Sequence, residues 1–326
     1  MNQQVFHLCS AELPVDETLS VLYCRFQPDS PDRPNQIKRI CLVTGTHGDE
    51  LEGQYVCFEV ARRLREYPEY LNGIVDIYPA LNPLGIDTIT RGIPAFDLDL
   101  NRIFPGDING TMVETMANEI VASLQGANLV IDYHASNIFL KEIPQARISD
   151  DSASTVMPFA EKLNLDFLWI HSSATVLEST LAHSLNSQGT PCVVVEVGVG
   201  MRITRSLGDK MVVGAFTVMK DMGIWTGPVD EISHPIDSRD GTVYYLNAAC
   251  SGIFVPDAKH EDIVKKDEQI GIIMDPLRGK VLQRILAPCD GYLFTLRAYP
   301  VVYEGSLLGR IFSDSISEEE NQEEEA

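Results

Sequence analysis

Hydrophobic and polar residues follow two different patterns along the first two-thirds of the chain. Short apolar runs at 40–43, 129–131 and 192–195 have the length and the β-branched content of buried strands. The segments 111–124 and 205–222 instead carry apolar residues at i, i+3 and i+4 spacing, which predicts helices with one apolar face. Strands and helices that alternate in this way predict an α/β fold in which helices cover a sheet.

The pattern changes after residue 228. Short β-rich runs such as 242–246 follow, separated by turn pairs that end in glycine, which predicts a smaller all-β domain. We therefore expect an α/β domain over residues 1–228 and an all-β domain over 229–314. The end of the chain, 315–326, holds six glutamates and no basic residue, which is typical of a disordered acidic tail.

Residues that can bind a metal ion stand at the ends of two predicted strands. His47 and Glu50, three residues apart, follow the first strand, and His134 follows the second. Ligands of open α/β sheets bind in the loops beyond the carboxyl ends of the strands, so these side chains are expected at one edge. Two histidines and one glutamate with an open fourth position form a catalytic zinc arrangement. A chance match on surface loops is the alternative.

A carboxylate interrupts the third apolar strand. Glu196 stands directly after the apolar run 192–195. Burial of a lone carboxylate is avoided unless a metal, a cation or a hydrogen-bond network receives it. This favours a functional site that faces Glu196, with a hydrogen-bonded network in the core as the alternative.

Four ordered segments resemble the succinylglutamate desuccinylase and aspartoacylase family, relatives of the zinc carboxypeptidases. The segments are Gly45 to Glu50, Asp97 to Gly106, Asp132 to His134 and Val195 to Gly198. The resemblance implies a zinc-carboxypeptidase-like mixed sheet flanked by helices, followed by a β domain similar to a biotinyl or lipoyl carrier barrel. It also implies one zinc ion per chain, held by His47, Glu50 and His134, with Glu196 as the general base and acid.

The resemblance also implies which residues bind the substrate. Asn101 and Arg102 match the carboxylate-binding dipeptide of the family, and a guanidinium fork suits that task because it meets both carboxylate oxygens. A structural Arg102, paired with Asp97 or Asp99, is the alternative.

Two further arginines are candidates for the same pocket. In the family, an arginine at the place of Arg91 stabilises the oxyanion that forms as water attacks, and a solvated loop arginine is the alternative. Relatives that bind a dicarboxylate carry another arginine shortly before the catalytic glutamate, but residues 181–188 contain none. Arg202, which follows Glu196, is a candidate replacement.

Composition and charge argue against several classes of protein. The formal net charge of −22 excludes a general nucleic-acid binder, because phosphate backbones require clustered lysine and arginine. No apolar run is long enough to span a membrane, and the N-terminus lacks the features of a signal peptide, so we expect a cytoplasmic protein. The seven cysteines show no C-x-x-C spacing, which argues against a disulfide scaffold and a cysteine zinc site.

These observations together predict a zinc-dependent amidohydrolase. Its partner is a small-molecule N-acylated amino acid that loses an acetyl or succinyl group, and a homo-oligomer is compatible with the sequence. The acidic surface makes a zwitterionic or cationic substrate, such as an acylated diamino acid, at least as plausible as a dicarboxylate. The alternatives are a metallocarboxypeptidase that cleaves a peptide or cell-wall fragment, and a catalytically silent binding protein on the same fold.

Overall fold

The computed structural model describes residues 1–13, 15–32, 36–94, 96–172 and 178–314. The chain divides into two compact units, each described separately below. The first, here called the α/β unit, contains residues 1–135 and 144–235, and the second, the β unit, contains 136–143 and the chain from 236 onward. The domain limits expected from the sequence, 1–228 and 229–314, stay a prediction, and the expected acidic tail lies outside the described residues.

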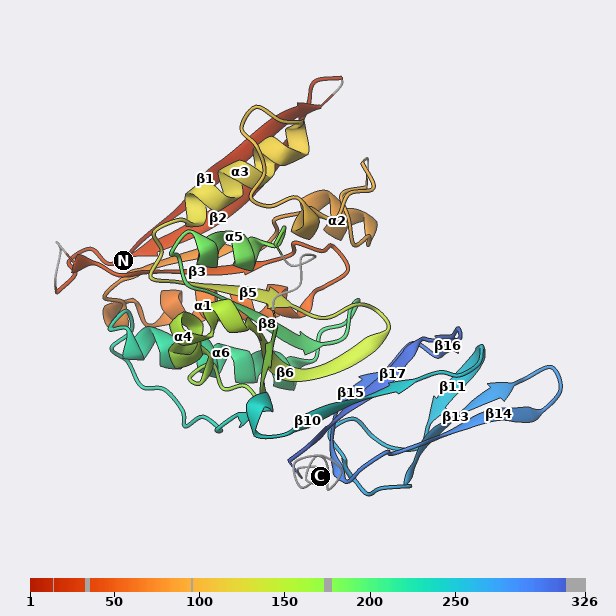
Figure 1. The fold of residues 1–326 in the computed structure, drawn as a ribbon. Coiled ribbons are helices and arrows are strands. Elements are labelled where there is room, and N and C mark those ends of the chain that lie inside the picture. The colour runs from red at the N-terminus through yellow and green to blue at the C-terminus, as the bar shows by residue number, and fades with distance from the viewer. Residues whose placement is uncertain (14, 33–35, 95, 173–177, 315–326) are drawn as a thin grey trace. The chain divides into compact units, whose positions relative to one another are not determined.

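A mixed sheet forms the centre of the α/β unit (Figure 1). Its strands are β1 (Asn2–Leu13), β2 (Glu17–Gln27), β3 (Arg39–Thr44), β4 (Ile74–Tyr78), β5 (Leu129–His134), β6 (Leu140–Ser149), β7 (Phe167–His171) and β8 (Cys192–Gly198). The first residues of β6, 140–143, belong to the β unit. They lie in the order β1-β2-β4-β3-β5-β8-β6, with β7 paired to β6. The central strands β4, β3, β5 and β8 run parallel, whereas β1 and β2 form an antiparallel hairpin at the edge.

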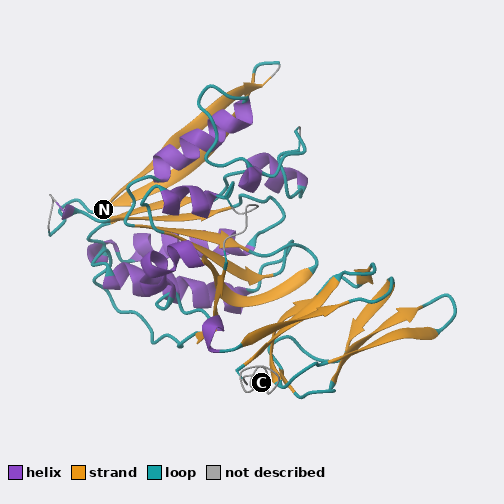
Figure 2. Ribbon diagram, in the orientation of Figure 1, coloured by secondary structure: helices purple, strands orange, loops and turns teal. Residues whose placement is uncertain are grey.

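Helices cover both faces of this sheet (Figure 2). They are α1 (Glu52–Glu66), α2 (Pro83–Thr88), α3 (Met112–Leu124), α4 (Asp150–Ala160), α5 (Leu181–Ser187) and α6 (Arg205–Asp221), with short 3-10 turns at Pro68–Tyr70 and Leu100–Arg102. Side chains alternate between the faces, so Ile40 and Leu42 pack with α1, α4 and α6, and Cys41 and Val43 pack with α3 and α5. Burial on both faces explains why β3 reads as a continuous apolar run.

The helices follow the predicted periodicity closely. The residues of α3 that are buried are the ones spaced at i, i+3 and i+4, and Thr111 caps the helix in a capping box with Glu114. Helix α6 ends one residue before Met222 and is followed by Gly223, whose φ of 73° suits a helix C-terminus. The predicted α/β architecture is therefore confirmed.

The β unit is built from short antiparallel strands. They are β9 (Ile236–Asp237), β10 (Thr242–Asn247), β11 (Gly252–Pro256), β12 (Ile263–Val264), β13 (Gln269–Asp275), β14 (Lys280–Leu286), β15 (Gly291–Arg297), β16 (Val301–Val302) and β17 (Leu307–Ser313), with a 3-10 turn at Ser238–Asp240. One sheet has β15, β17 and β10 side by side, and the other has the order β14-β13-β11-β16. A separate hydrophobic core lies within this unit. The predicted all-β region is confirmed.

No helix among the described residues is long and apolar enough to cross a membrane.

Candidate active site

The loop after β3 places the first two candidate ligands. Gly45 has a φ of 68°, and a side chain at Gly48 would lie 1.9 Å from the carbonyl carbon of Gly85, so this close approach requires glycine. The N–H of Gly48 donates to the carbonyl oxygens of Thr90 and Arg91 at 3.1 and 3.3 Å. The segment 45–50 is thereby fixed against the loop that carries Arg91.

The parallel strands place the other two residues. His134 is the last residue of β5, and Glu196 is its register partner on β8. Because β3 lies on the other side of β5, the loop that follows β3 starts at the same end of the sheet. His47, Glu50, His134 and Glu196 are therefore brought to one edge, at the carboxyl ends of the strands, as the sequence predicts.

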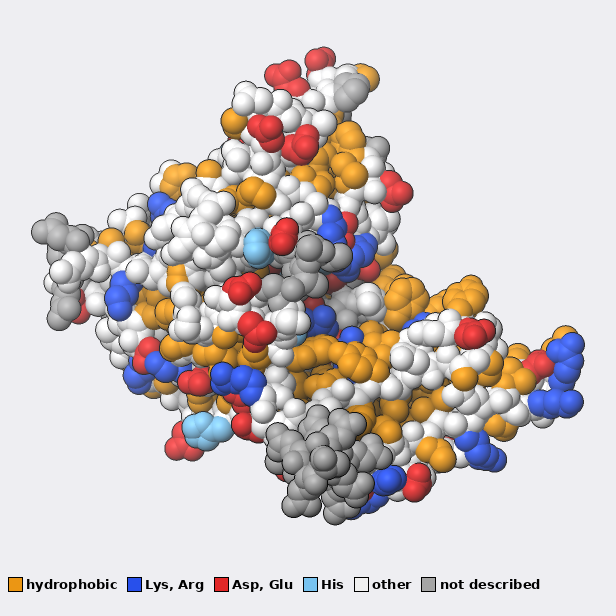
Figure 3. Space-filling view, viewed as in Figure 1, with side chains coloured by type: hydrophobic (Ala, Val, Ile, Leu, Met, Phe, Trp, Pro, Cys, Tyr) orange, Lys and Arg blue, Asp and Glu red, His pale blue; other side chains and the backbone are white. Residues whose placement is uncertain are grey.

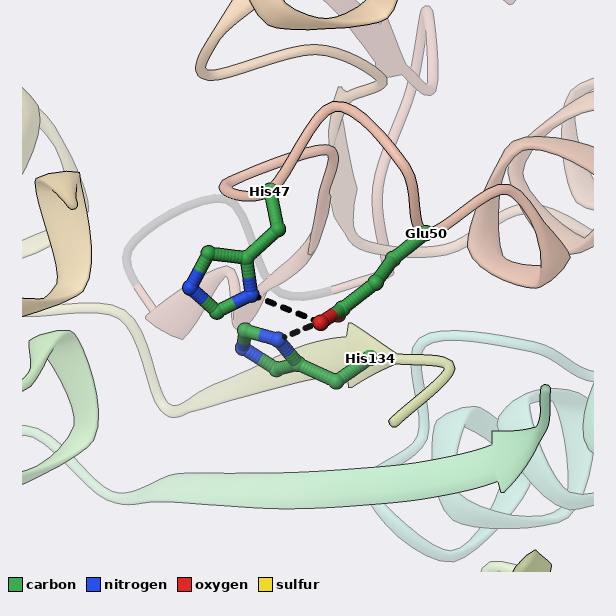
Figure 4. A group of neighbouring side chains, drawn as sticks. All are labelled: His47, Glu50 and His134. Carbon is green, nitrogen blue, oxygen red and sulfur yellow. Dashed lines mark hydrogen bonds and ion pairs between the residues drawn. The ribbon is translucent and has the colours of Figure 1, made fainter. Parts of the chain in front are cut away.

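His47, Glu50 and His134 form a buried cluster (Figure 4). Nδ1 of His47 lies 2.8 Å from Oε1 of Glu50, and Nδ1 of His134 lies 2.8 Å from Oε2 of the same carboxylate. Each residue offers one atom that could coordinate a metal, and these atoms lie within 4.8 Å of one another. This cluster could hold a metal ion.

Further carboxylates orient the two imidazoles. Nε2 of His47 lies 3.1 Å from Oδ1 of Asp99, and Nε2 of His134 lies 3.1 Å from Oδ2 of Asp132. A carboxylate on the far nitrogen fixes the tautomer and leaves Nδ1 as the donor to a metal, an arrangement that metal-binding histidines commonly show. The donor set therefore fits a zinc ion in both residue types and orientation.

The charges of the cluster also suit a divalent cation. Glu50, Asp99 and Asp132 carry three negative charges when ionised, and the Arg91 guanidinium contacts both Glu50, at 3.1 Å, and Asp99, at 3.3 Å. With neutral imidazoles, these carboxylates outnumber the arginine, so the cluster carries a net negative charge. Buried charges are stable only when they are paired, so this excess of negative charge supports a cation site.

Without a metal, protons on the imidazoles offset part of the negative charge of the cluster. Burial disfavours the charged form of His47 and of His134, but the neighbouring carboxylates outweigh it and raise both pKa values. Burial would likewise raise the pKa of Glu50, but the two imidazoles outweigh burial and lower it. A metal ion must therefore displace protons from the histidines when it binds.

The predicted substrate residues lie on the next segments. Oδ1 of Asn101 accepts a hydrogen bond from the N–H of Leu181 at 2.9 Å, which fixes the turn Leu100–Arg102 against α5. The exposed Arg102 donates to the carbonyl oxygen of Asn101, and among the described residues it forms no ion pair, with Asp97, Asp99 or any other residue. The alternative of a structural Arg102 paired with these aspartates is therefore not what the structure has.

Arg91 and Arg202 occupy different surroundings. Arg91 lies against the candidate ligand Glu50, so the structure brings it to the cluster. Arg202 is exposed, although its loop is joined to the candidate ligand loop by a hydrogen bond of 2.6 Å from the N–H of Met201 to the carbonyl oxygen of Asp49. The roles predicted for both arginines stay predictions.

Two residues near the site were missed by the sequence analysis as functional groups. Asp99 lies inside the segment that carried the resemblance, but its contact with His47 spans 52 residues and has no local signal. Arg147 on β6 places its Nε 3.8 Å from Oε1 of Glu196, and its guanidinium lies 5.3 Å from the ring centroid of Trp169. No local signal in the sequence pointed to this contact, because β6 also contains Lys141, Glu142 and Gln145.

A model of the succinylglutamate desuccinylase/aspartoacylase catalytic domain matches residues 36–222, more than half of the chain. The chain belongs to this family. The resemblance predicted from the four segments is thus confirmed, and the matched region contains all the candidate metal, catalytic and substrate-binding residues.

Solved structures of the succinylglutamate desuccinylase/aspartoacylase family share the fold over nearly the whole chain. The succinylglutamate desuccinylase/aspartoacylase of Rhodobacter sphaeroides aligns with a TM-score of 0.79 and 23% identity, over 96% of both chains. A succinylglutamate desuccinylase from a Silicibacter species aligns with a TM-score of 0.81 and 21% identity, over 95% of both chains. The product-bound ectoine utilization protein EutE of Ruegeria pomeroyi has a TM-score of 0.78 and 19% identity, over 94% of both.

A relative with a named activity matches a shorter segment. The N-alpha-acetyl-L-2,4-diaminobutyric acid deacetylase of Halomonas elongata is 34% identical over 114 residues. The match covers 34% of this chain and 33% of the relative, so it spans about a third of that protein.

Proposed function

We propose that the protein is a zinc-dependent deacylase of N-acylated amino acids. The observation that carries the proposal is the buried cluster in which Nδ1 of His47 and Nδ1 of His134 both face the carboxylate of Glu50. The register pairing of His134 with Glu196 adds a carboxylate beside this cluster, where a general base is needed.

His47, Glu50 and His134 would hold the zinc ion. When bound, zinc would supply a Lewis acid that activates water and polarises the amide carbonyl. Glu196 takes a proton from the attacking water and delivers it to the nitrogen of the leaving amine, so that water adds to the acyl carbon as the C–N bond breaks. The products are a carboxylate and a free amino group.

The arginines have separate tasks in this scheme. Arg91, which contacts Glu50 and Asp99, stabilises the negative charge that develops on the carbonyl oxygen of the substrate. Arg102 presents its guanidinium to the carboxylate of the amino acid, with Asn101 beside it. Arg147 lies beside Glu196 and holds that carboxylate in position.

An N-acetylated diamino acid is the first substrate to test. The relative that matches part of the chain is named for removal of the acetyl group from such a compound. The net charge of −22 does not steer dicarboxylates towards the protein, whereas it does not oppose a substrate that carries an ammonium group.

The test combines metal analysis with a substrate panel. Elemental analysis of the purified chain should give one zinc ion per chain, and the same sample should release amine from one class among N-α-acetyl-2,4-diaminobutyrate, N-acetylaspartate and N-succinylglutamate. Glu196→Gln is the control for adventitious hydrolysis. Zinc without amine release, but with cleavage of peptides that have a free α-carboxylate beyond the scissile amide, would instead indicate the metallocarboxypeptidase. A chain with neither metal nor turnover would be the silent binding protein.

A further inference from the structure

A pocket of about 430 Å³ that is wide open to solvent, here called the cavity, lies within the β unit. Its lining residues are Phe139, Arg297, Tyr299, Val301, Tyr303 and Ser306, and all of them belong to this unit. Figure 3 shows hydrophobic side chains gathered over β15, β16 and β17, the strands whose ends and loops form the cavity. A volume of this size is typical of pockets that take small organic molecules.

Arg297 is the charged residue of the cavity. It is 9% exposed, and its three hydrogen bonds all go to backbone carbonyl oxygens. Nε donates to Tyr299 at 2.8 Å, Nη1 to Leu307 at 3.1 Å and Nη2 to Val301 at 2.6 Å. A guanidinium has five N–H groups, so two are not used in these bonds.

The cation of Arg297 has no counter-ion in the described part of the chain. Its recorded contacts there are the three carbonyl bonds and the ring of Phe139, 5.2 Å from the guanidinium carbon, and no carboxylate is among them. By contrast, Arg310 in the same unit pairs with the buried Glu142 at 3.0 Å. Burial lowers the pKa of Arg297, as expected for a cation removed from water without an opposite charge.

The other residues that line the cavity indicate what kind of group could lie beside Arg297. Phe139 and Tyr299 pack edge to face, with ring centroids 5.7 Å apart, and Tyr303 is 71% exposed at the cavity. The Ser306 Oγ accepts a hydrogen bond from the N–H of Tyr303 at 3.0 Å, which leaves its hydroxyl hydrogen to donate elsewhere. Aromatic walls favour a flat apolar body, and a buried guanidinium favours a carboxylate that it can meet with two N–H groups.

We propose that this cavity binds a small organic carboxylate with an aromatic or similarly apolar body. The carboxylate pairs with Arg297, and Phe139, Tyr299 and Tyr303 flank the apolar part. None of the residues that line the cavity belongs to the His47, Glu50 and His134 cluster, so the inference does not depend on the proposed deacylase activity.

The test is titration calorimetry of the full-length chain with 2-naphthoate and with its neutral isostere, 2-naphthamide. We expect naphthoate to bind at least about 10-fold more tightly than the amide, because only the carboxylate neutralises the buried cation. Arg297→Gln should abolish this preference. Tyr303→Ala leaves the Arg297 bonds in place and should weaken naphthoate binding about 3- to 10-fold, since it removes one aromatic wall. Tyr245→Ala, an exposed aromatic residue of the same unit that does not line the cavity, is the matched control and should bind like wild type.

Three results would overturn the proposal. Equal binding of naphthoate and naphthamide would leave Arg297 as a structural clamp for the 299–307 loop. If Tyr303→Ala does not change naphthoate binding, the ligand binds at another site, which could be the candidate metal site. A chain that ends at Asp314 and binds naphthoate at least about 10-fold more tightly than the full chain would assign the cavity to the chain's own glutamates, because the sequence 315–326 contains six carboxylates that could compete for it.

Discussion

The α/β unit and the β unit each contain a charged centre, and the two centres have opposite signs. In the α/β unit, Glu50, Asp99 and Asp132 converge on two imidazoles and one arginine. In the β unit, the buried Arg297 meets carbonyl oxygens and one aromatic ring. Buried charge is costly unless it is paired, so the first centre is built for a cation and the second for an anion.

Burial alone does not decide whether such a centre favours a cation or an anion. The side chains of His134 and His260 are both largely buried, but carboxylates raise the pKa of His134 despite its burial, whereas burial, helped by the charge of Lys141, lowers the pKa of His260. The charges placed around a group therefore decide which ion it can receive. The following experiments test this difference, beginning with the largest expected effect.

His134→Ala should remove the metal and reduce turnover to background. The substitution deletes one of three protein ligands and leaves Glu50 with one imidazole fewer. Elemental analysis after gel filtration measures the loss, and folding is checked by circular dichroism. Unchanged metal content would remove His134 from the ligand set.

Glu196→Gln should keep the metal and lower kcat about 10²- to 10⁴-fold, because the amide retains the shape of the side chain but cannot accept the proton of water. Elemental analysis and steady-state kinetics on the same sample separate the two effects. Glu161→Gln, a glutamate at the end of α4, is the matched control. Undiminished turnover would refute the general-base role.

Arg91→Met should lower kcat about 10²- to 10³-fold through loss of charge aimed at the developing oxyanion. Arg202→Met, which removes an exposed arginine on a neighbouring loop, is the comparison. An equal and small effect of both substitutions would mean that Arg91 does not stabilise the oxyanion and that its contacts with Glu50 and Asp99 are structural. A larger effect of Arg202→Met on KM would support its predicted place at the substrate.

Asp99→Asn should weaken zinc binding about 10- to 100-fold, because the carboxylate that orients His47 is replaced by a neutral group. The affinity is measured by competition with a chromophoric chelator. Asp107→Asn, in an exposed loop where the carboxylate accepts from the N–H of Asn109, is the matched control. Equal affinities for both variants would mean that Asp99 does not support the metal site.

The metal-free chain should lose stability as pH rises above about 6.5. The raised pKa values of His47 and His134 contribute stability that is present below the unfolded value of about 6.5 and is lost as pH rises through the folded values. The lowered pKa of Glu50 adds no slope in this window, because its contribution is lost only as pH falls far below it. Urea titrations at several pH values measure the slope.

Two comparisons sharpen the pH experiment. His134→Gln should show a smaller slope than the metal-free wild type, since one of the two titrating imidazoles is absent. In the metal-loaded chain the trend should reverse, because zinc binds neutral imidazoles and gains affinity as protons leave. A slope that is the same in all three samples would place the titrating group elsewhere.

The sequence predicted the strands and helices that carry the site better than the side-chain contacts within it. The strands that end near His47, His134 and Glu196 follow from apolar runs, and the exclusively buried stripe of α3 follows from its periodicity. Asp132 could be suggested as a partner of His134 because residues two apart on a strand share a face. Asp99 and Arg147 could not be assigned in this way, since their partners lie 52 and 49 residues away in the chain.

By itself, the sequence determined the α/β order, the all-β region and the segments that carry the family resemblance, because periodicity and motifs are local properties of the chain. Only the tertiary structure decided which carboxylate meets which imidazole, that Arg147 lies beside Glu196, and that Arg297 is buried without a carboxylate. Those contacts depend on strand register and loop path. The groups that the fold places around a buried charge determine whether it is paired within the protein or can bind an ion of opposite sign.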